Sequence, residues 1–254
     1  MKIIFAILIF SIIILFHELG HFLLAKRAGI RVNEFCIGLG PTLVGFTKGE
    51  TKYSIKLLPF GGACMMEGED GDSKAEDSFQ SKSVGARISV VAAGPVFNFI
   101  MAFVCAIILV ACTGYDRPVI SGVMDGYPAQ EAGMKEGDVI KKLNSKKIHL
   151  YREVSIYTFF HGDQSIDVVY ERDGKTHETT ITPRYDKEND RYLFGFYGSG
   201  ERTKGGPVKT LQYGVYEVKY WIASTLESLK MLVTGQVGIN EMSGPVGIVK
   251  GVSD

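Results

Sequence analysis

The sequence has no excess of either charge. Its 254 residues include 28 lysines and arginines and 28 aspartates and glutamates, so the formal net charge is zero. A protein that holds a nucleic-acid backbone needs a basic surface, and this balance therefore excludes nucleic acid as a partner. Charged residues make up only 22% of the chain and aromatic residues 11%, which also excludes an intrinsically disordered protein.

Cysteine is scarce as well. The chain has four cysteines, which are Cys36, Cys64, Cys105 and Cys112, and no CxxC pair. Cys105 and Cys112 lie in one apolar run, where a helix would separate them by about 10.5 Å along its axis, beyond the reach of a disulfide. The pattern excludes a disulfide framework and a zinc site made of cysteines alone, and it predicts that the thiols are packing residues.

The sequence does have long apolar runs. Residues 3–25 are apolar apart from Ser11 and a five-residue segment that begins at His17. As a helix this run would be about 34 Å long, which is enough to cross a bilayer core of about 30 Å. A signal peptide is the alternative, because Lys2 precedes the run, but no small-residue cleavage site follows it. Residues 88–112 contain no Asp, Glu, Lys or Arg and predict a second span.

A third candidate helix, residues 211–233, is interrupted by four charged residues. Its amphipathic pattern predicts either a span that packs against other helices or an interfacial helix. Nine lysines and arginines lie between residues 26 and 87, whereas only Lys2 precedes the first span. The positive-inside rule therefore places loop 26–87 in the cytoplasm, and the N-terminus and the region after residue 112 outside it.

Two further regions carry strand patterns. Within the loop, residues 32–46 and 51–59 predict a β-hairpin, apolar enough to lie against the membrane or dip into it. Residues 115–186 predict a small α+β domain with a helix at residues 151–160. Its expected strands are residues 119–124, 138–143, 166–170 and 176–181.

The first span contains an HExxH motif, formed by His17, Glu18 and His21. On a helix, residues four apart share a face, so both imidazoles can reach one zinc ion. Glu18 can then take a proton from a zinc-bound water, which makes that water a nucleophile. The alternative is a chance match to this short motif. However, ionisable groups about 21 Å along an apolar span are costly to bury, so packing alone does not account for them. The motif therefore predicts a metal site.

Several motifs resemble those of the bacterial site-2-type intramembrane zinc proteases that carry a PDZ domain. Besides HELGH, residues 35–41 are similar to F-x-I-G-x-G-P and residues 53–62 to Y-x-I-x-x-x-P-x-G-G. Residues 93–99 are similar to A-G-P-x-x-N-F, and residues 243–248 to a motif that follows the third helix. Residues 128–140 resemble the P-A-x-x-A-G-(L/M)-x-x-G-D-x-I signature of bacterial PDZ domains.

The resemblance implies a mixed fold, namely a polytopic α-helical membrane protein with a membrane-associated β-hairpin and an inserted α+β PDZ domain. Residues 1–114 are expected to form the membrane core, with spans at about 3–25 and 88–112 and the hairpin loop at 32–60. Residues 115–186 are the expected PDZ domain, which either binds a peptide or excludes bulky substrates. Residues 187–254 are the expected linker, third helix and start of the C-terminal membrane region.

The resemblance also implies a function. His17 and His21 are the expected zinc ligands and Glu18 the catalytic base of an endopeptidase in the bacterial inner membrane. Its expected substrates are single-span membrane proteins, such as anti-sigma factors or signal peptides, which it cuts within the bilayer in regulated intramembrane proteolysis. The alternative is a PDZ-bearing membrane scaffold that has lost its catalytic activity.

The third zinc ligand departs from this pattern. The family takes it from an aspartate in a downstream L-D-G motif, which the 254 residues do not contain. Cys36, Cys64 and the acidic residues within 67–77 could substitute in principle, while the terminal Asp254 lacks the motif's context. The expectation is that this chain is a fragment, which binds zinc weakly and cleaves nothing alone.

Overall fold

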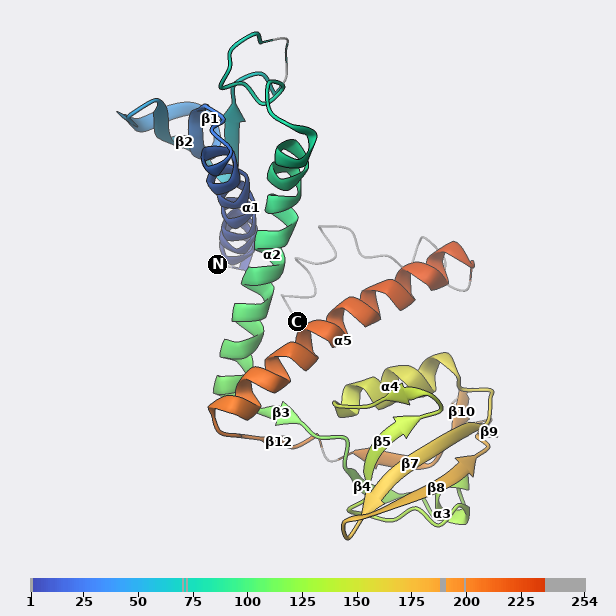
Figure 1. Cartoon of the computed structure of the whole chain (residues 1–254). Helices are drawn as coiled ribbons and strands as arrows, with labels where there is room; N and C mark the ends of the chain where they lie inside the picture. Colours follow the sequence, from blue (N-terminus) through green and yellow to red (C-terminus); the bar gives the residue numbers. More distant parts are fainter. Residues whose placement is uncertain (1, 70, 72, 188–190, 199, 236–254) are drawn as a thin grey trace. The chain divides into compact units, whose positions relative to one another are not determined.

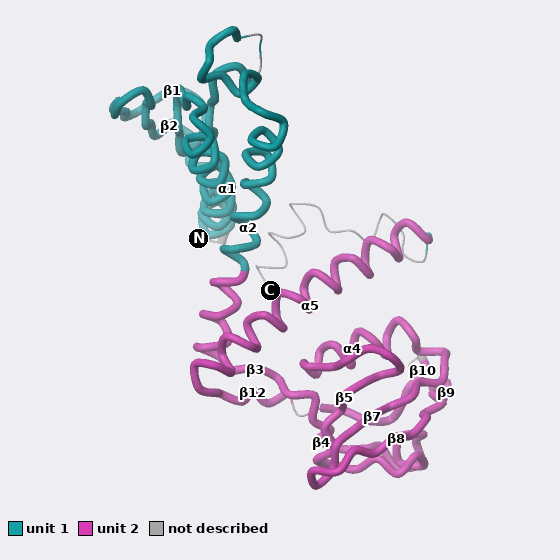
Figure 2. The backbone as a smooth tube through the Cα atoms, viewed as in Figure 1, with its two compact units in different colours: residues 1–102, 235–254 teal, residues 103–234 magenta. Residues whose placement is uncertain are grey.

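The computed structural model describes residues 2–69, 71, 73–187, 191–198 and 200–235 (Figure 1). The chain divides into two compact units, residues 1–102 with 235–254 and residues 103–234 (Figure 2). The motif at residues 243–248 and the expected start of a C-terminal membrane region lie outside the described residues.

The first unit is built on two long apolar helices, α1 (Lys2–Arg27) and α2 (Val84–Thr113), the second of which continues into the other unit. Ile4–Arg27 and Val84–Thr113 are each long and apolar enough to cross a membrane. Large apolar side chains cover their surfaces and are exposed, as at Phe5 (60%) and Ile88 (63%). Both helices expected from the apolar runs are thus confirmed.

Between the helices lies an antiparallel hairpin of β1 (Val32–Lys48) and β2 (Thr51–Met66). Both strands bend at glycines with positive φ, Gly38 at 87° and Gly61 at 86°, a conformation that other residues rarely adopt. Each strand therefore contributes two segments to the sheet. Residues 35–37 pair with residues 62–64 on one side and with residues 53–55 on the other. The predicted hairpin is confirmed, and its second strand runs seven residues past Pro59.

The second half of β2 runs alongside α1. The Ser11 hydroxyl donates to the Pro59 carbonyl at 2.6 Å, and the Cys64 N–H donates to a Glu18 carboxylate oxygen at 2.9 Å. Ser11 and Glu18 are seven residues apart, or about 10.5 Å along the helix. An apolar cluster fixes the end of β2 to the end of α1 and to α2. Its buried members are Ala25, Ile30, Val32, Cys64, Met66 and Val90.

The second unit has an α+β core. A four-stranded sheet in the order β6-β5-β7-β8 is accompanied by the pairs β4–β11, β3–β12 and β9–β10. The strands are β3 (Tyr115–Asp116), β4 (Ile120–Val123), β5 (Val139–Leu143), β6 (Lys146–Lys147), β7 (Ile166–Arg172), β8 (Lys175–Ile181), β9 (Arg184–Asp186), β10 (Arg191–Leu193), β11 (Phe196–Gly198) and β12 (Arg202–Thr203). The helices are α3 (Pro128–Glu131), α4 (Tyr151–Phe160) and α5 (Pro207–Val233).

The sequence anticipated most of this core. The four expected strands appear as β4, β5, β7 and β8, and the helix at residues 151–160 is α4. Alternating side chains of the strands, such as Ile166 and Val168, face a buried core that also contains Ile140 and Leu143. Phe194 lies in the same core, so the domain extends beyond its predicted end at residue 186.

Helix α5 has two different faces. One carries apolar side chains that are exposed, at Val208, Leu211, Val215, Ile222, Leu226, Leu229 and Val233. The other packs within the unit, where Tyr213 stacks on Tyr115 with ring centroids 3.5 Å apart and Tyr216 on His149 at 3.9 Å. Burial lowers the pKa of His149, so this ring packs in its neutral form. Only α1 and α2 among the described helices have the length and hydropathy of a membrane span, and the choice for α5 between a packed span and an interfacial helix stays a prediction.

A buried ion cluster anchors α5 to α4. The Arg152 guanidinium donates to the Asp116 carboxylate at 2.9 Å and to the Glu217 carboxylate, and it lies over the Tyr220 ring. Glu217 is fully buried, so its charge is tolerable only because Arg152 pairs with it. Arg152 therefore pairs with two carboxylates, Asp116 of β3 and Glu217 of α5.

Removing Arg152 is expected to destabilise this unit more than removing Glu217. Arg152→Leu leaves two buried carboxylates without a cation, at a cost on the order of 3 kcal/mol. Glu217→Leu leaves Arg152 bonded to Asp116, and we expect less than half of that loss. Amide hydrogen exchange of α4 and α5 in the purified protein measures both effects. Equal losses for the two variants would contradict the assignment.

Candidate active site

The HExxH histidines share one face of α1. His17 and His21 are one helical turn apart, and their rings meet edge to face with centroids 4.8 Å apart. Both residues are half-buried, as is Glu18 between them. The helix thus brings the two imidazoles together, as the motif predicts.

Gly94 of α2 provides the space into which both imidazoles point. A Cβ atom added at Gly94 would lie 2.5 Å from His21 Nε2 and 2.6 Å from His17 Nε2. The helices come this close because Gly20 also lacks a side chain, and a Cβ there would lie 2.5 Å from the Ala93 carbonyl oxygen. Two nitrogen donors therefore converge on one small space, and this arrangement fits a zinc ion, which accepts imidazole nitrogen at about 2.0–2.1 Å.

Two groups of α2 contact the far sides of the imidazoles. His21 Nδ1 lies 2.8 Å from the Val90 carbonyl oxygen, and His17 Nδ1 lies 3.2 Å from the Asn98 side-chain nitrogen. A carbonyl only accepts, so His21 Nδ1 must carry a proton, and in the neutral ring Nε2 then keeps a free lone pair. The sequence contains no sign of the Val90 contact. It did show Asn98 as the strongly polar side chain in an otherwise apolar span.

Glu18 faces the edge of the hairpin. Its Oε2 accepts the Cys64 N–H at 2.9 Å, on the opposite side of β2 from the pairing with β1. A cavity of about 500 Å³ opens beside it, lined mainly by residues 62–69, with Asn33, Gly71 and Ser73. The carboxylate is thus held by a backbone group and borders space that a substrate could enter.

No third metal-binding side chain accompanies the two histidines in the described part of the chain, where no group of three His, Cys, Asp or Glu could hold an ion. Cys36 and Cys64, the substitutes considered from the sequence, are buried in the hairpin. The Cys36 thiol contacts the Gly38 carbonyl oxygen at 3.9 Å. The two cysteines thus stay substitutes in principle, and a third ligand from a downstream L-D-G motif stays a prediction.

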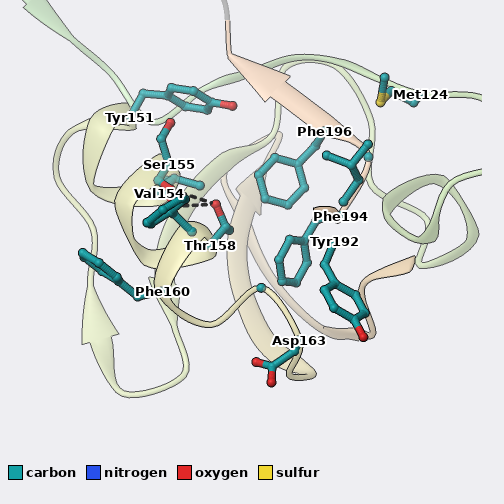
Figure 3. A pocket seen from close by; sticks show the side chains of 14 residues that line it. Met124, Tyr151, Val154, Ser155, Thr158, Phe160, Asp163, Tyr192, Phe194 and Phe196 are labelled. Atoms are coloured by element: carbon teal, nitrogen blue, oxygen red, sulfur yellow. Dashed lines mark hydrogen bonds between the residues drawn. The ribbon is translucent and has the colours of Figure 1, made fainter. Parts of the chain in front are cut away.

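A second hollow lies in the α+β unit. It has a volume of about 570 Å³ and is lined by α4 on one side and by residues 192–196 on the other. Figure 3 shows Phe194 and Phe196 facing Val154, Ser155 and Thr158 of the helix across this pocket. Because β11 pairs with β4 alone among the described strands, the groove also offers an unpaired strand edge.

The sequence matches the profile of peptidase family M50 over residues 5–254. This match covers nearly the whole chain. The chain belongs to peptidase family M50. It is therefore a metalloprotease of the site-2 type, with zinc as its cofactor.

Relatives with this chemistry align with almost the whole chain. A protein of Clostridium acetobutylicum named as a zinc metalloprotease is 37% identical over 249 residues, covering 98% of this chain and 73% of its own. The regulator of sigma-W protease RasP of Bacillus subtilis is 30% identical over 325 residues, covering 95% of this chain and 77% of its own.

Two solved structures each match about a third of this chain. The PDZ domain of an SdrC-like protein from Listeria monocytogenes is 18% identical, with a TM-score of 0.29, and the match covers 34% of this chain and 88% of that domain. The corresponding domain from Listeria innocua is 20% identical with a TM-score of 0.30, covering 34% of this chain and 98% of that domain.

Filling the space at Gly94 is expected to abolish tight zinc binding. In Gly94→Ala the new methyl group would overlap both Nε2 atoms, which lie well inside normal contact distance. Displacing the two ligands should weaken zinc binding at least about tenfold. Gly85→Ala is the matched control, because no atom lies within 4 Å of a Cβ at that position of α2. Zinc content and chelator competition on the complete gene product test this, and unchanged zinc in Gly94→Ala would refute it.

Proposed function

We propose that this protein is an intramembrane zinc endopeptidase that cuts the membrane-spanning segments of other membrane proteins. One observation carries the proposal. Two histidine Nε2 atoms converge beside Gly94, next to the Glu18 carboxylate, on a helix long and apolar enough to cross a bilayer. Ionisable residues within a membrane-spanning helix are costly, and where they occur they usually mark a functional site.

The chain's own residues divide the work. His17 and His21 would hold the zinc through Nε2, and the bound zinc supplies a water that is acidic near neutral pH. Glu18 accepts a proton from the attacking water and returns it to the leaving amine, as a general base and then a general acid. The Cys64 N–H holds Oε2 of Glu18 by a hydrogen bond, so Oε1 remains available to take up and release the proton.

The hairpin supplies a place for the substrate. A transmembrane helix has its backbone bonds satisfied internally, so a peptide bond must be unwound before attack. The outer edge of residues 62–66 carries no paired strand among the described residues and lies beside Glu18 and its cavity. An unwound segment that adds to this edge would place its backbone next to the carboxylate.

The hairpin also fits a location at the membrane. Glu50, in its first turn, pairs with Lys26 at the basic end of α1 at 2.6 Å, whereas Pro59 is bonded to Ser11, deep in the apolar part of that helix. We therefore propose that the sheet dips into the bilayer from the cytoplasmic side. In this orientation loop 26–87 is cytoplasmic, and the N-terminus and residues 115–186 lie outside the inner membrane.

We further propose single-span membrane proteins of the anti-sigma-factor type as substrates, because the relative from Bacillus subtilis is named as a regulator of sigma-W. Residues 115–186 would form the PDZ domain. Its groove, with an unpaired edge of β11 facing α4, is what peptide binding by strand addition requires. Size exclusion is the alternative, and it needs no groove.

The competing function is a membrane scaffold without catalytic activity. Zinc retained without any peptide cleavage by the complete gene product would support the scaffold over the protease.

Replacing the proposed base separates zinc binding from catalysis. In Glu18→Gln the amide keeps an oxygen for the Cys64 N–H but cannot take up a proton, so folding and zinc content should be unchanged. Cleavage of a membrane substrate should fall by about 10²-fold or more. Turnover by the complete gene product measures this, and a rate near that of the wild type would show that Glu18 is not the base.

The orientation predicts opposite labelling of two exposed turns. In a background without the exposed Cys105 and Cys112, Lys48→Cys should react with an impermeant maleimide only from the cytoplasmic side. Lys175→Cys should react only from the outside. Labelling of both positions from the same side would contradict the span at residues 88–112, and labelling with the two sides exchanged would favour a signal sequence at residues 3–25.

A further inference from the structure

One face of α2 contacts both histidines. Val90, Gly94 and Asn98 are four residues apart, so they stack along that face, and each contacts an imidazole of α1. The Val90 carbonyl fixes the tautomer of His21, since it must accept a proton from Nδ1. For His17 the corresponding partner is the Asn98 amide, which can either donate or accept.

The amide of Asn98 can be turned in two ways. With its nitrogen towards His17, Nδ1 accepts, and the proton of the neutral ring lies on Nε2, where it blocks metal binding. In that orientation the Asn98 Oδ1 is buried and has no partner among the described residues. The opposite orientation gives the oxygen a donor, His17 Nδ1–H, and frees Nε2. In either orientation one end of the amide has no hydrogen-bond partner among the described residues. The tautomer that His17 needs for binding a metal therefore determines which orientation is favoured.

We propose that Asn98 is a positioning residue for His17. The side-chain oxygen of Asn98 accepts the Nδ1–H of His17, which keeps the Nε2 atom of His17 unprotonated and directed at the space beside Gly94. The inference rests on the proposed role of His17 as a zinc ligand. Under it, α2 holds both imidazoles in the same tautomer, one through a backbone carbonyl and one through a side-chain carbonyl. Such partners of metal-binding histidines typically change metal affinity by about 10–100-fold.

Zinc affinity of Asn98 variants tests the proposal. Asn98→Leu keeps the size of the side chain and removes the acceptor, so the zinc Kd should rise about 10–100-fold. Asn98→Asp keeps an oxygen acceptor in either protonation state and should bind within about threefold of the wild type. Ser89→Ala is the control, because the exposed Ser89 hydroxyl bonds the Ala86 carbonyl of its own helix. The measurement is competition with a zinc chelator on the complete gene product.

The outcomes are separable. Wild-type affinity in Asn98→Leu would overturn the proposal, and so would an Asn98→Asp variant as weak as Asn98→Leu, since the amide nitrogen would then be the needed group. If Asn98→Leu does not fold, Asn98→Ala carries the same expectation. His17→Ala serves as the reference. If His17→Ala binds zinc as tightly as the wild type, the proposed function fails as well. If His17→Ala loses zinc affinity and Asn98→Leu does not, only the role of Asn98 is overturned.

Discussion

The close approach of α1 and α2 at Gly94 is the constraint on which the rest of the site depends. Two glycines make it possible, since a Cβ at Gly20 would meet the Ala93 carbonyl and a Cβ at Gly94 would meet both imidazoles. Small residues of this kind are the usual means by which helices pack closely where no water is present to drive burial. Without that contact the histidines would be two isolated polar groups on an apolar helix, which is an unfavourable arrangement.

Helix α1 also positions the edge of the hairpin that is proposed to bind the substrate. Glu18 lies between the two histidines and accepts the Cys64 N–H, so the edge of the hairpin is held directly at the chemistry. The bond from Ser11 to Pro59 extends this contact by two turns of α1. One surface of α1 thus combines the proposed zinc ligands, the proposed base and the contact with the strand edge.

Local patterns were predictable from the sequence. The HExxH spacing, the two apolar helices and the alternating strands of the α+β unit each follow from residues a few positions apart. The partners of the histidines could not be foreseen, because Val90 lies 69 residues from His21 and Asn98 lies 81 residues from His17. Glu217 was misleading for another reason. A glutamate on an amphipathic helix indicates solvent, yet Arg152 pairs with it in the interior.

Zinc X-ray absorption spectroscopy of the complete gene product tests the central claim most directly, because it identifies the atoms bound to the metal. The account predicts two imidazole nitrogens at about 2.0–2.1 Å and no sulfur at about 2.3 Å. His17→Ala and His21→Ala should each remove one imidazole from the spectrum. A sulfur signal that disappears in Cys36→Ser or Cys64→Ser, or an unchanged spectrum in the histidine variants, would show that the metal is bound elsewhere.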